Sequence, residues 1–192
     1  RPFREKSIDT IKNETKSLCE QTGYEEVSLS SLSTSDYTEI NKLLENLVEY
    51  TDGEQINLSL PSLRIDNFSE ELLEKIKSVR KSGLTFAPEA GTQRLRDVIN
   101  KNITEDEIMR TCRTAFEGGY STVKLYFMLG LPEETLEDVE GIAKLAQKVL
   151  DLYYETPKEK RGKSVQISVS TATFVPKPFT PFEFEPQATP EE

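Results

Sequence analysis

The fold is decided by the stretch Val123-Lys124-Leu125-Tyr126-Phe127-Met128-Leu129-Gly130-Leu131-Pro132-Glu133-Glu134-Thr135. Apolar and polar residues alternate up to Leu129, which is typical of a strand with one buried face. Gly130 and Pro132 end that strand, and Thr135 with Asp138 forms a capping-box pattern that starts a helix. A strand that leads directly into a helix is the first half of a β-α-β unit.

The same switch between a period of 2 and a period of 3.6 recurs along the chain. Strands are expected around residues 27–32, 56–60, 84–87, 123–129 and 165–173. Helices are expected over 8–23, from a cap at Asp36 through the stripe 40–48, over 72–79, 93–101, 108–116 and 136–149, with a second capping box at Thr104 and Glu107. This alternation predicts an α/β fold with parallel strands joined by right-handed crossovers. Five strands are too few for an eight-stranded barrel of about 250 residues, so an open sheet or a partial barrel is expected.

The second face of the expected strands is polar. Serine, asparagine, lysine, tyrosine and glutamine alternate with the apolar residues, as at Ser28, Asn57, Lys124, Tyr126 and Gln166. A parallel sheet covered by helices on both faces would instead read as continuous apolar runs. The pattern therefore predicts a curved sheet whose concave side lines a binding lumen. An antiparallel sheet with one solvated face is the alternative.

The composition excludes several reaction classes. The 192 residues contain no histidine and two cysteines, Cys19 and Cys112, so the chain cannot build a Ser-His-Asp or Cys-His relay or an ordinary zinc site. Two distant cysteines form no disulfide framework, which indicates a reducing, cytoplasmic location and two half-buried helix thiols. The net charge of −10 argues against direct nucleic-acid binding. The apolar runs are too short for a membrane helix, so no membrane partner is expected.

Three strand-end loops are unusual: Phe86-Ala87-Pro88-Glu89-Ala90-Gly91-Thr92, the loop at 124–135 quoted above, and Phe174-Val175-Pro176-Lys177-Pro178-Phe179-Thr180-Pro181-Phe182. Each has a plain structural explanation, because Gly91 and Gly130 suit turns and Pro132 suits a helix start. In parallel α/β folds, however, ligands bind at the carboxyl ends of the strands. These loops are therefore the candidate site.

Taken together and in this order, the loops resemble the radical S-adenosylmethionine (SAM) superfamily over essentially the whole chain. Pro88-Glu89-Ala90-Gly91-Thr92, with a helix that ends at Val98-Ile99-Asn100-Lys101, looks like the element of the fourth strand. Gly130-Leu131-Pro132-Glu133-Glu134-Thr135 looks like the motif after the fifth strand that borders adenine. The segment 174–182, with Arg1-Pro2-Phe3-Arg4-Glu5-Lys6-Ser7, is most similar to an uncharacterised bacterial group whose longer members carry a cobalamin-binding-like region before the core.

The resemblance implies a partial parallel (β/α)6 TIM-like barrel of which strands two to six are present and the first is missing. Residues 1–175 would form the core, truncated at its N-terminus, and residues 176–192 a proline-rich site edge or linker. The superfamily holds a four-iron, four-sulfur cluster on a CxxxCxxC loop, and neither Cys19 nor Cys112 matches it. We therefore expect a fragment that contains no metal ligand and no catalytic residue and is inactive alone.

The matching positions imply binding roles toward SAM. Glu89 would accept hydrogen bonds from the ribose hydroxyls, and Lys101 would approach the ligand's carboxylate or ribose, with Arg94 or Arg96 as less suitable substitutes. The remaining candidates are placed around the nucleoside and the methionyl amine: inward-facing Tyr126 and Met128, Gly130 and Leu131 against adenine, Val175 on its other side, and Ser30 and Ser31 where many relatives have Gly-Gly-Glu.

In full length, the resemblance implies an enzyme that reductively cleaves SAM with its cluster and abstracts a substrate hydrogen through a 5′-deoxyadenosyl radical. An electron donor such as flavodoxin or ferredoxin, an unidentified substrate and cobalamin in another domain are implied as well. The alternative is a non-catalytic α/β ligand-binding or interaction module. A third possibility is an enzyme that uses Lys124 or Lys177 as a base or Schiff-base nucleophile.

Overall fold

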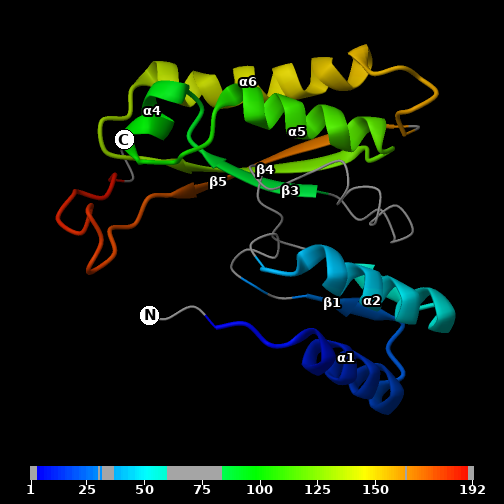
Figure 1. Cartoon of the computed structure of the whole chain (residues 1–192). Coiled ribbons are helices and arrows are strands. Elements are labelled where there is room, and N and C mark those ends of the chain that lie inside the picture. The colour runs from blue at the N-terminus through cyan, green and yellow to red at the C-terminus, as the bar shows by residue number, and fades with distance from the viewer. Residues whose placement is uncertain (1–3, 30, 32–36, 60–83, 163, 190–192) are drawn as a thin grey trace. The chain divides into compact units, whose positions relative to one another are not determined.

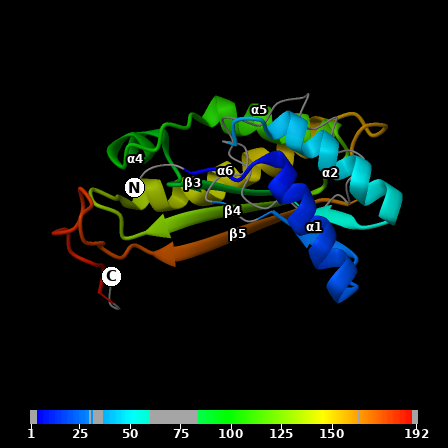
Figure 2. The same ribbon diagram turned by 60° about the horizontal axis from the view of Figure 1, so that its bottom comes forward.

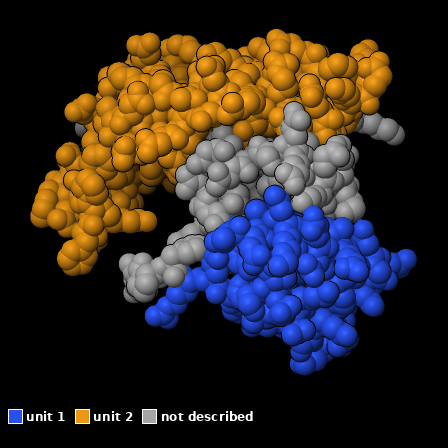
Figure 3. Space-filling model, in the orientation of Figure 1, with its two compact units in different colours: residues 1–84 blue, residues 85–192 orange. Residues whose placement is uncertain are grey.

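The structure is a computed structural model that describes residues 4–29, 31, 37–59, 84–162 and 164–189. The chain forms two compact units, residues 1–84 and residues 85–192 (Figure 3). The expected helix over 72–79 and the expected cap Asp36 lie outside the described residues, as does part of the expected first and second strands.

The first unit contains two helices and two short strands (Figure 1). They are α1 (Ile8–Thr22), β1 (Glu26–Ser28), α2 (Ile40–Glu54) and β2 (Asn57–Ser59). β1 and β2 pair in parallel, with Val27 opposite Leu58. The first helix ends at Gly23 as predicted, because Gly23 adopts a left-handed φ of 71° and its N–H donates to the Cys19 carbonyl at 2.8 Å.

The start of α2 differs from the prediction. Its N-cap is Glu39, which makes no side-chain capping hydrogen bond, and not Asp36. Tyr37 and Thr38 are held by the segment that precedes α1. The Tyr37 hydroxyl donates to the Lys6 carbonyl at 2.9 Å, and the Thr38 N–H donates to Glu5 at 2.8 Å. These contacts keep residues 37 and 38 out of the helix.

The second unit is a three-stranded sheet with helices on one face (Figures 1 and 2). Its elements are β3 (Leu84–Glu89), α4 (Gln93–Val98), α5 (Glu105–Glu117), β4 (Thr122–Leu129), α6 (Leu136–Glu155) and β5 (Gln166–Thr173). The strand order is β3-β4-β5, and β4 and β5 pair in parallel from Thr122–Gln166 to Leu129–Thr173. This confirms the predicted β-α-β unit. None of the described helices is both long and apolar enough to cross a membrane, since the 20-residue α6 carries charged residues along its length.

The alternation along β4 separates a core face from a polar face. Val123, Leu125 and Phe127 are buried, whereas the Tyr126 side chain is exposed and the Lys124 ammonium lies 4.7 Å from the centre of its ring. The polar second face predicted from the sequence is therefore confirmed on this strand. On β5 the expected apolar face is incompletely covered, since Val169 is 44% exposed. β5 is the outermost strand of the described sheet, so the helices cover it less than β4.

The helix after β3 is shorter than the expected 93–101. It ends at Val98, and Asn100 takes a left-handed φ of 53°. The Lys101 N–H donates to the Arg96 carbonyl at 2.8 Å and the Asn100 N–H donates to Asp97 at 3.0 Å. This pair of bonds is a Schellman motif with asparagine in the place usual for glycine. Lys101 therefore follows the helix in a defined turn.

Two glycines allow the turn after β3 to touch α6. A Cβ on Gly91 would overlap main-chain atoms of Asp138 and Ile142 and lie 2.7 Å from the Gly141 carbonyl carbon. A Cβ on Gly141 would lie 2.8 Å from Thr92 Cγ2 and 2.9 Å from the Gly91 carbonyl carbon. Backbone therefore packs directly on backbone here, and neither position has room for a methyl group.

Alanine at either position should destabilise the protein. We expect Gly91→Ala and Gly141→Ala each to cost about 1–3 kcal/mol of unfolding free energy, because the neighbouring main chain must move. Gly53→Ala is the matched control, since a Cβ at that helical position meets nothing within 4 Å. Urea unfolding midpoints measure the effect, and a Gly91→Ala protein as stable as Gly53→Ala would contradict the close contact.

Candidate functional site

The carboxyl ends of the strands in the second unit meet around one apolar cluster. Its buried members are Ala90, Leu95, Leu131 and Phe174, and Val98, Ile99, Met128 and Phe182 pack against it. These residues come from the turns after β3 and β4, from the end of β4, from α4 and its C-cap, and from the segment after β5. Because ligands of parallel α/β folds bind at such strand ends, this end of the sheet is the candidate site.

Glu89 is the last residue of β3 and has a strained backbone. Its φ of 68° lies in the left-handed region, which is uncommon outside glycine and concentrates at functional sites. Its Oε1 lies 3.4 Å from the Lys101 ammonium, and the two side chains are 26% and 31% exposed. The structure thus brings the two predicted nucleoside-binding side chains together. One offers two acceptor oxygens and the other a cationic donor.

The turn that follows Glu89 is fixed from inside by Arg96. This arginine is fully buried, and its Nη1 donates to the Ala90 carbonyl at 2.9 Å. Its Nη2 donates to Gln93 at 3.3 Å, whereas its Nε has no hydrogen-bond partner among the described residues. Burial lowers the pKa of the guanidinium, against the opposing effect of Glu105 and Asp97. Arg96 therefore holds the turn, and its donors point at protein backbone and Gln93.

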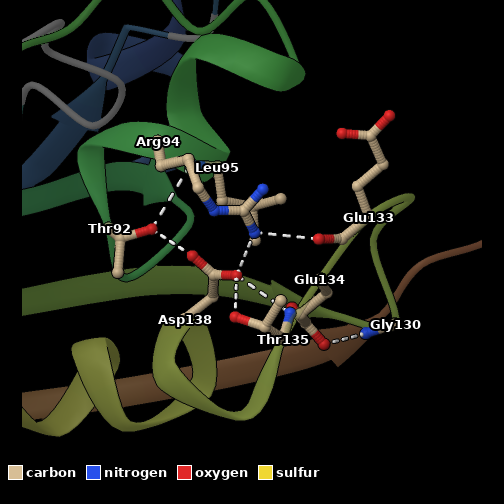
Figure 4. A network of polar contacts seen from close by, with 8 residues as sticks. All are labelled: Thr92, Arg94, Leu95, Gly130, Glu133, Glu134, Thr135 and Asp138. Atoms are coloured by element: carbon tan, nitrogen blue, oxygen red, sulfur yellow. Dashed lines mark hydrogen bonds and ion pairs between the residues drawn. The ribbon is translucent and has the colours of Figure 1, made fainter.

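The turn that follows β4 is closed by its own glutamate and by Arg94 (Figure 4). Gly130, with a φ of 75°, donates its N–H to Glu134 Oε2 at 2.7 Å. Arg94 on α4 donates from Nη2 to the Glu133 carbonyl at 2.8 Å. Glu133 itself has a left-handed φ of 62°. The turn is thus held in one conformation by groups that reach it from both sides.

Asp138 joins these two turns (Figure 4). Its side chain is 2% exposed and accepts hydrogen bonds from the Thr92 hydroxyl and from Arg94 Nη2 on one side. On the other side it accepts from the Thr135 N–H at 2.9 Å and the Thr135 hydroxyl at 2.7 Å. Burial would raise the pKa of Asp138, but the hydrogen bonds from Thr92, Thr135 and Arg94 outweigh it and hold the pKa well below its usual range.

Sequence reasoning identified Asp138 only as a capping residue. The capping box with Thr135 is present, as is the one predicted at Thr104 and Glu107. The contacts to Thr92 and Arg94 span 46 and 44 positions in the sequence. A single sequence contains no signal for contacts at that separation, so the connection between the two turns became visible only in the fold.

The other predicted site residues are spread over the strand ends and the first unit. Leu131 is buried in the apolar cluster, Met128 packs against it, and Val175 is exposed. Tyr126 lies on the polar face of β4, two positions before Met128. Ser31 is exposed beside a cavity of about 370 Å³ in the first unit, together with Arg4, Ile11 and Leu18, and Ser30 lies outside the described residues.

The segment after β5 packs onto this end of the sheet. The rings of Phe174 and Phe182 meet edge to face with their centres 6.2 Å apart. A Cβ on Gly130 would lie 2.8 Å from the Cβ of Ala188, so the turn after β4 and the end of the proline-rich segment are in contact. Phe179 and Lys177 of the same segment are exposed. Part of this segment thus borders the candidate site.

The sequence matches the model of the family described as the Radical SAM superfamily over residues 1–146. The match covers well over half of the chain and includes both turns of the candidate site. The chain therefore belongs to the radical SAM superfamily, whose members use SAM and a [4Fe–4S] cluster.

Two relatives share a detectable sequence similarity with the chain. The uncharacterized protein MJ0966 of Methanocaldococcus jannaschii is 38% identical over 159 residues, which are 83% of this chain and 32% of the relative. The uncharacterized methyltransferase PH0819 of Pyrococcus horikoshii is 31% identical over 93 residues, 48% of this chain and 20% of the relative. The chain thus spans no more than about a third of the length of either protein.

Solved structures of radical SAM enzymes share the fold. This chain superposes with a TM-score of 0.63 on the methyltransferase TsrM from Kitasatospora setae in its complex with tryptophan and aza-SAM. The identity is 16%, and the superposition covers 76% of this chain and 29% of TsrM. Its structure with cobalamin and a [4Fe–4S] cluster gives 0.64 at 15% identity, covering 86% and 29%. The coproporphyrinogen III oxidase HemN from Escherichia coli gives 0.52 at 11% identity, covering 71% and 36%. These likenesses confirm the predicted α/β partial-barrel class.

The two cofactors of the superfamily differ in how well this chain fits them. A cluster held through three thiolates does not fit, because the chain has two cysteines and both are buried. Burial raises the pKa of Cys112 to about 12, which keeps it from serving as a thiolate. Within the described ranges no group of three or more His, Cys, Asp or Glu is placed to hold a metal. SAM does fit the acceptor oxygens of Glu89 and the donor ammonium of Lys101.

Removing the charge of Asp138 should change how stability depends on pH. We expect Asp138→Asn to cost about 1–3 kcal/mol near neutral pH, because its buried donors lose a charged acceptor. A lowered pKa in the folded state stabilises the protein above the unfolded value of about 3.9, and this contribution is lost as pH falls. The difference in unfolding free energy between wild type and variant should therefore shrink as the pH falls from about 5 toward 3.

Chemical denaturation at a series of pH values measures this difference. Glu107→Gln is the control, since Glu107 occupies the equivalent capping position on α5 but lies in an exposed box. If the difference in unfolding free energy between wild type and Asp138→Asn stays constant down to pH 3, that result would contradict an ionised, strongly hydrogen-bonded Asp138.

Proposed function

We propose that this chain is the SAM-binding core of a radical SAM enzyme and that the nucleoside binds at the carboxyl ends of β3 and β4. The observation that carries the proposal is the pair Glu89–Lys101, 3.4 Å apart, on a strained strand end within the segment matched by the family. A carboxylate beside an ammonium, both partly exposed, is suited to ribose hydroxyls and a ligand carboxylate.

In this proposal each site residue has a binding role. Glu89 accepts from the ribose hydroxyls, and Lys101 donates to the methionyl carboxylate or the ribose. Met128, Gly130, Leu131 and Val175 are assigned to the surroundings of adenine, with Tyr126 facing the lumen. From the sequence resemblance alone, Ser30 and Ser31 are assigned to the methionyl amine. Leu131 contributes to adenine binding from within the apolar cluster, and the Gly130 N–H is already used by Glu134. No residue of the chain is assigned a catalytic role.

SAM held by this chain, with a cluster held outside residues 1–192, would supply 5′-deoxyadenosyl radical chemistry for hydrogen-atom abstraction in the complete enzyme. The residues of this chain bind and orient the nucleoside and exclude water from it. With two buried cysteines, residues 1–192 alone do not provide the cluster, so we expect no SAM cleavage by this chain by itself. The complete enzyme would be cytoplasmic and draw electrons from a flavodoxin or ferredoxin.

Two further parts of the proposal concern domain organisation. Residues 1–175 would form the partial-barrel core and residues 176–192 the edge of the site, which the contacts of Phe182 and Ala188 support. Cobalamin would bind in another domain of the complete protein. The TsrM structure, which contains both cobalamin and a [4Fe–4S] cluster and shares this fold, supports that assignment.

Neutralising Glu89 or Lys101 should weaken SAM binding. Each removes a hydrogen bond to a charged group, so we expect Glu89→Gln and Lys101→Met to raise the dissociation constant of SAM by about 10- to 100-fold. Equilibrium dialysis with labelled SAM measures this on the complete gene product, reconstituted anaerobically with iron and sulfide.

The matched controls are Glu140→Gln and Lys144→Met, which break an exposed ion pair of 3.0 Å on α6. These variants should bind SAM as the wild type does. A reconstituted wild-type protein that neither binds SAM nor forms 5′-deoxyadenosine under reduction would overturn the proposal. That result would favour a non-catalytic ligand-binding module instead.

A further inference from the structure

The two turns that carry the proposed nucleoside groups are far apart in sequence. Glu89 leads into residues 90–92, and Gly130 leads into residues 131–135, with α5 and β4 between them. Chain connectivity alone therefore does not set the distance between the ribose-binding and adenine-binding groups. Loops at strand ends are also the more mobile parts of such folds. Something in the tertiary structure must hold one turn against the other.

We propose that Asp138 is a positioning residue for SAM binding, which locks the turn 89–92 to the turn 130–135. The inference rests on the proposed function. Asp138 is almost completely buried and accepts from two residues of the first turn and its helix, Thr92 and Arg94. It also accepts both the N–H and the hydroxyl of Thr135, at the end of the second turn.

The arrangement requires a carboxylate. One oxygen, Oδ1, accepts from Thr92, and the other, Oδ2, accepts from Arg94 and twice from Thr135. An ionised carboxylate is purely an acceptor, whereas an asparagine amide would place a donor against Thr92 or Arg94. Asparagine therefore keeps the shape of the side chain but disrupts one side of the junction.

Two neighbouring contacts transmit the position of Asp138 to both turns. Arg94 bonds to Asp138 and also to the Glu133 carbonyl, so the same guanidinium reaches into the second turn. The Gly91 and Gly141 backbones touch beside it without side chains that could absorb a shift. A displacement of α6 is therefore passed to residues 90–92 and from there to Glu89.

The helix α5 provides a matched control within the same unit. Its capping box has the same plan, because Glu107 accepts from the Thr104 N–H at 2.8 Å and from the Thr104 hydroxyl at 2.9 Å. Both boxes place an acidic residue three positions after a threonine cap. The bonds between Glu107 and Thr104 join neighbours within one helix start, whereas Asp138 also bonds to Thr92 and to Arg94 of α4. Glu107→Gln and Asp138→Asn therefore both neutralise a capping-box carboxylate, and only the second removes the carboxylate that Thr92 and Arg94 bind.

The test measures SAM binding to the complete gene product, reconstituted anaerobically, by equilibrium dialysis. We expect Asp138→Asn and Thr92→Val to raise the dissociation constant about 5- to 30-fold, in the upper part of the range of long-range coupling effects. Glu107→Gln should remain within about two-fold of wild type, near the level of an uncoupled surface change. Thr92→Ser keeps the hydroxyl and should restore wild-type binding. It thus separates a positioning role from simple loss of stability.

Hydrogen–deuterium exchange of the same proteins supplies a second measurement. Asp138→Asn and Thr92→Val should speed exchange in residues 89–95 and 130–135 together, whereas Glu107→Gln should affect only the start of α5. Faster exchange in one turn alone, or wild-type SAM affinity in both variants, would overturn the inference while leaving the proposed function intact. Failure of the wild-type protein itself to bind SAM would overturn both.

Discussion

The buried carboxylate of Asp138 is the interaction on which the second unit's strand-end geometry depends. Four donors from α4, the turn before it and the start of α6 converge on two oxygen atoms. Because the group is almost fully removed from water, leaving these donors unpaired would be costly, and their convergence offsets the desolvation of the charge. Gly91 and Gly141 let the two backbones approach closely enough for this to happen. The turns after β3 and β4 are consequently parts of one structure.

The positions of Glu89 and Lys101 follow from local backbone features around that junction. Arg96 pins the Ala90 carbonyl immediately after Glu89, and the Schellman motif at Asn100 directs Lys101 back toward the strand end. The six-residue α4 lies between Glu89 and Lys101 in the chain and contributes Arg96 to both of these features. The result is an acidic and a basic side chain 3.4 Å apart at this strand end, and both are partly exposed, which suits a polar ligand.

Much of the secondary structure could be predicted from the sequence because its signals are local. The strand period of 123–129, the stop at Gly23 and the capping boxes at Thr104 and Thr135 depend on neighbours a few positions away. Predictions failed where distant residues intervened. The contacts of Tyr37 and Thr38 with residues 5 and 6 moved the start of α2, and the outer position of β5 left Val169 exposed. Leu131 was expected beside adenine from its motif, and its burial in the apolar cluster could be seen only in the fold.

The sequence by itself determined the α/β class, the parallel β-α-β unit and the superfamily, because periodicity, caps and motif order are all encoded in neighbouring residues. It also determined that three cluster thiolates are not among these 192 residues. Only the tertiary structure decided that Asp138 joins the two turns and that Glu89 pairs with Lys101. The same holds for Arg96, which donates to the Ala90 carbonyl from a buried position. Those facts depend on which side chains from separate segments meet in a water-excluded space, and residue order does not specify such meetings.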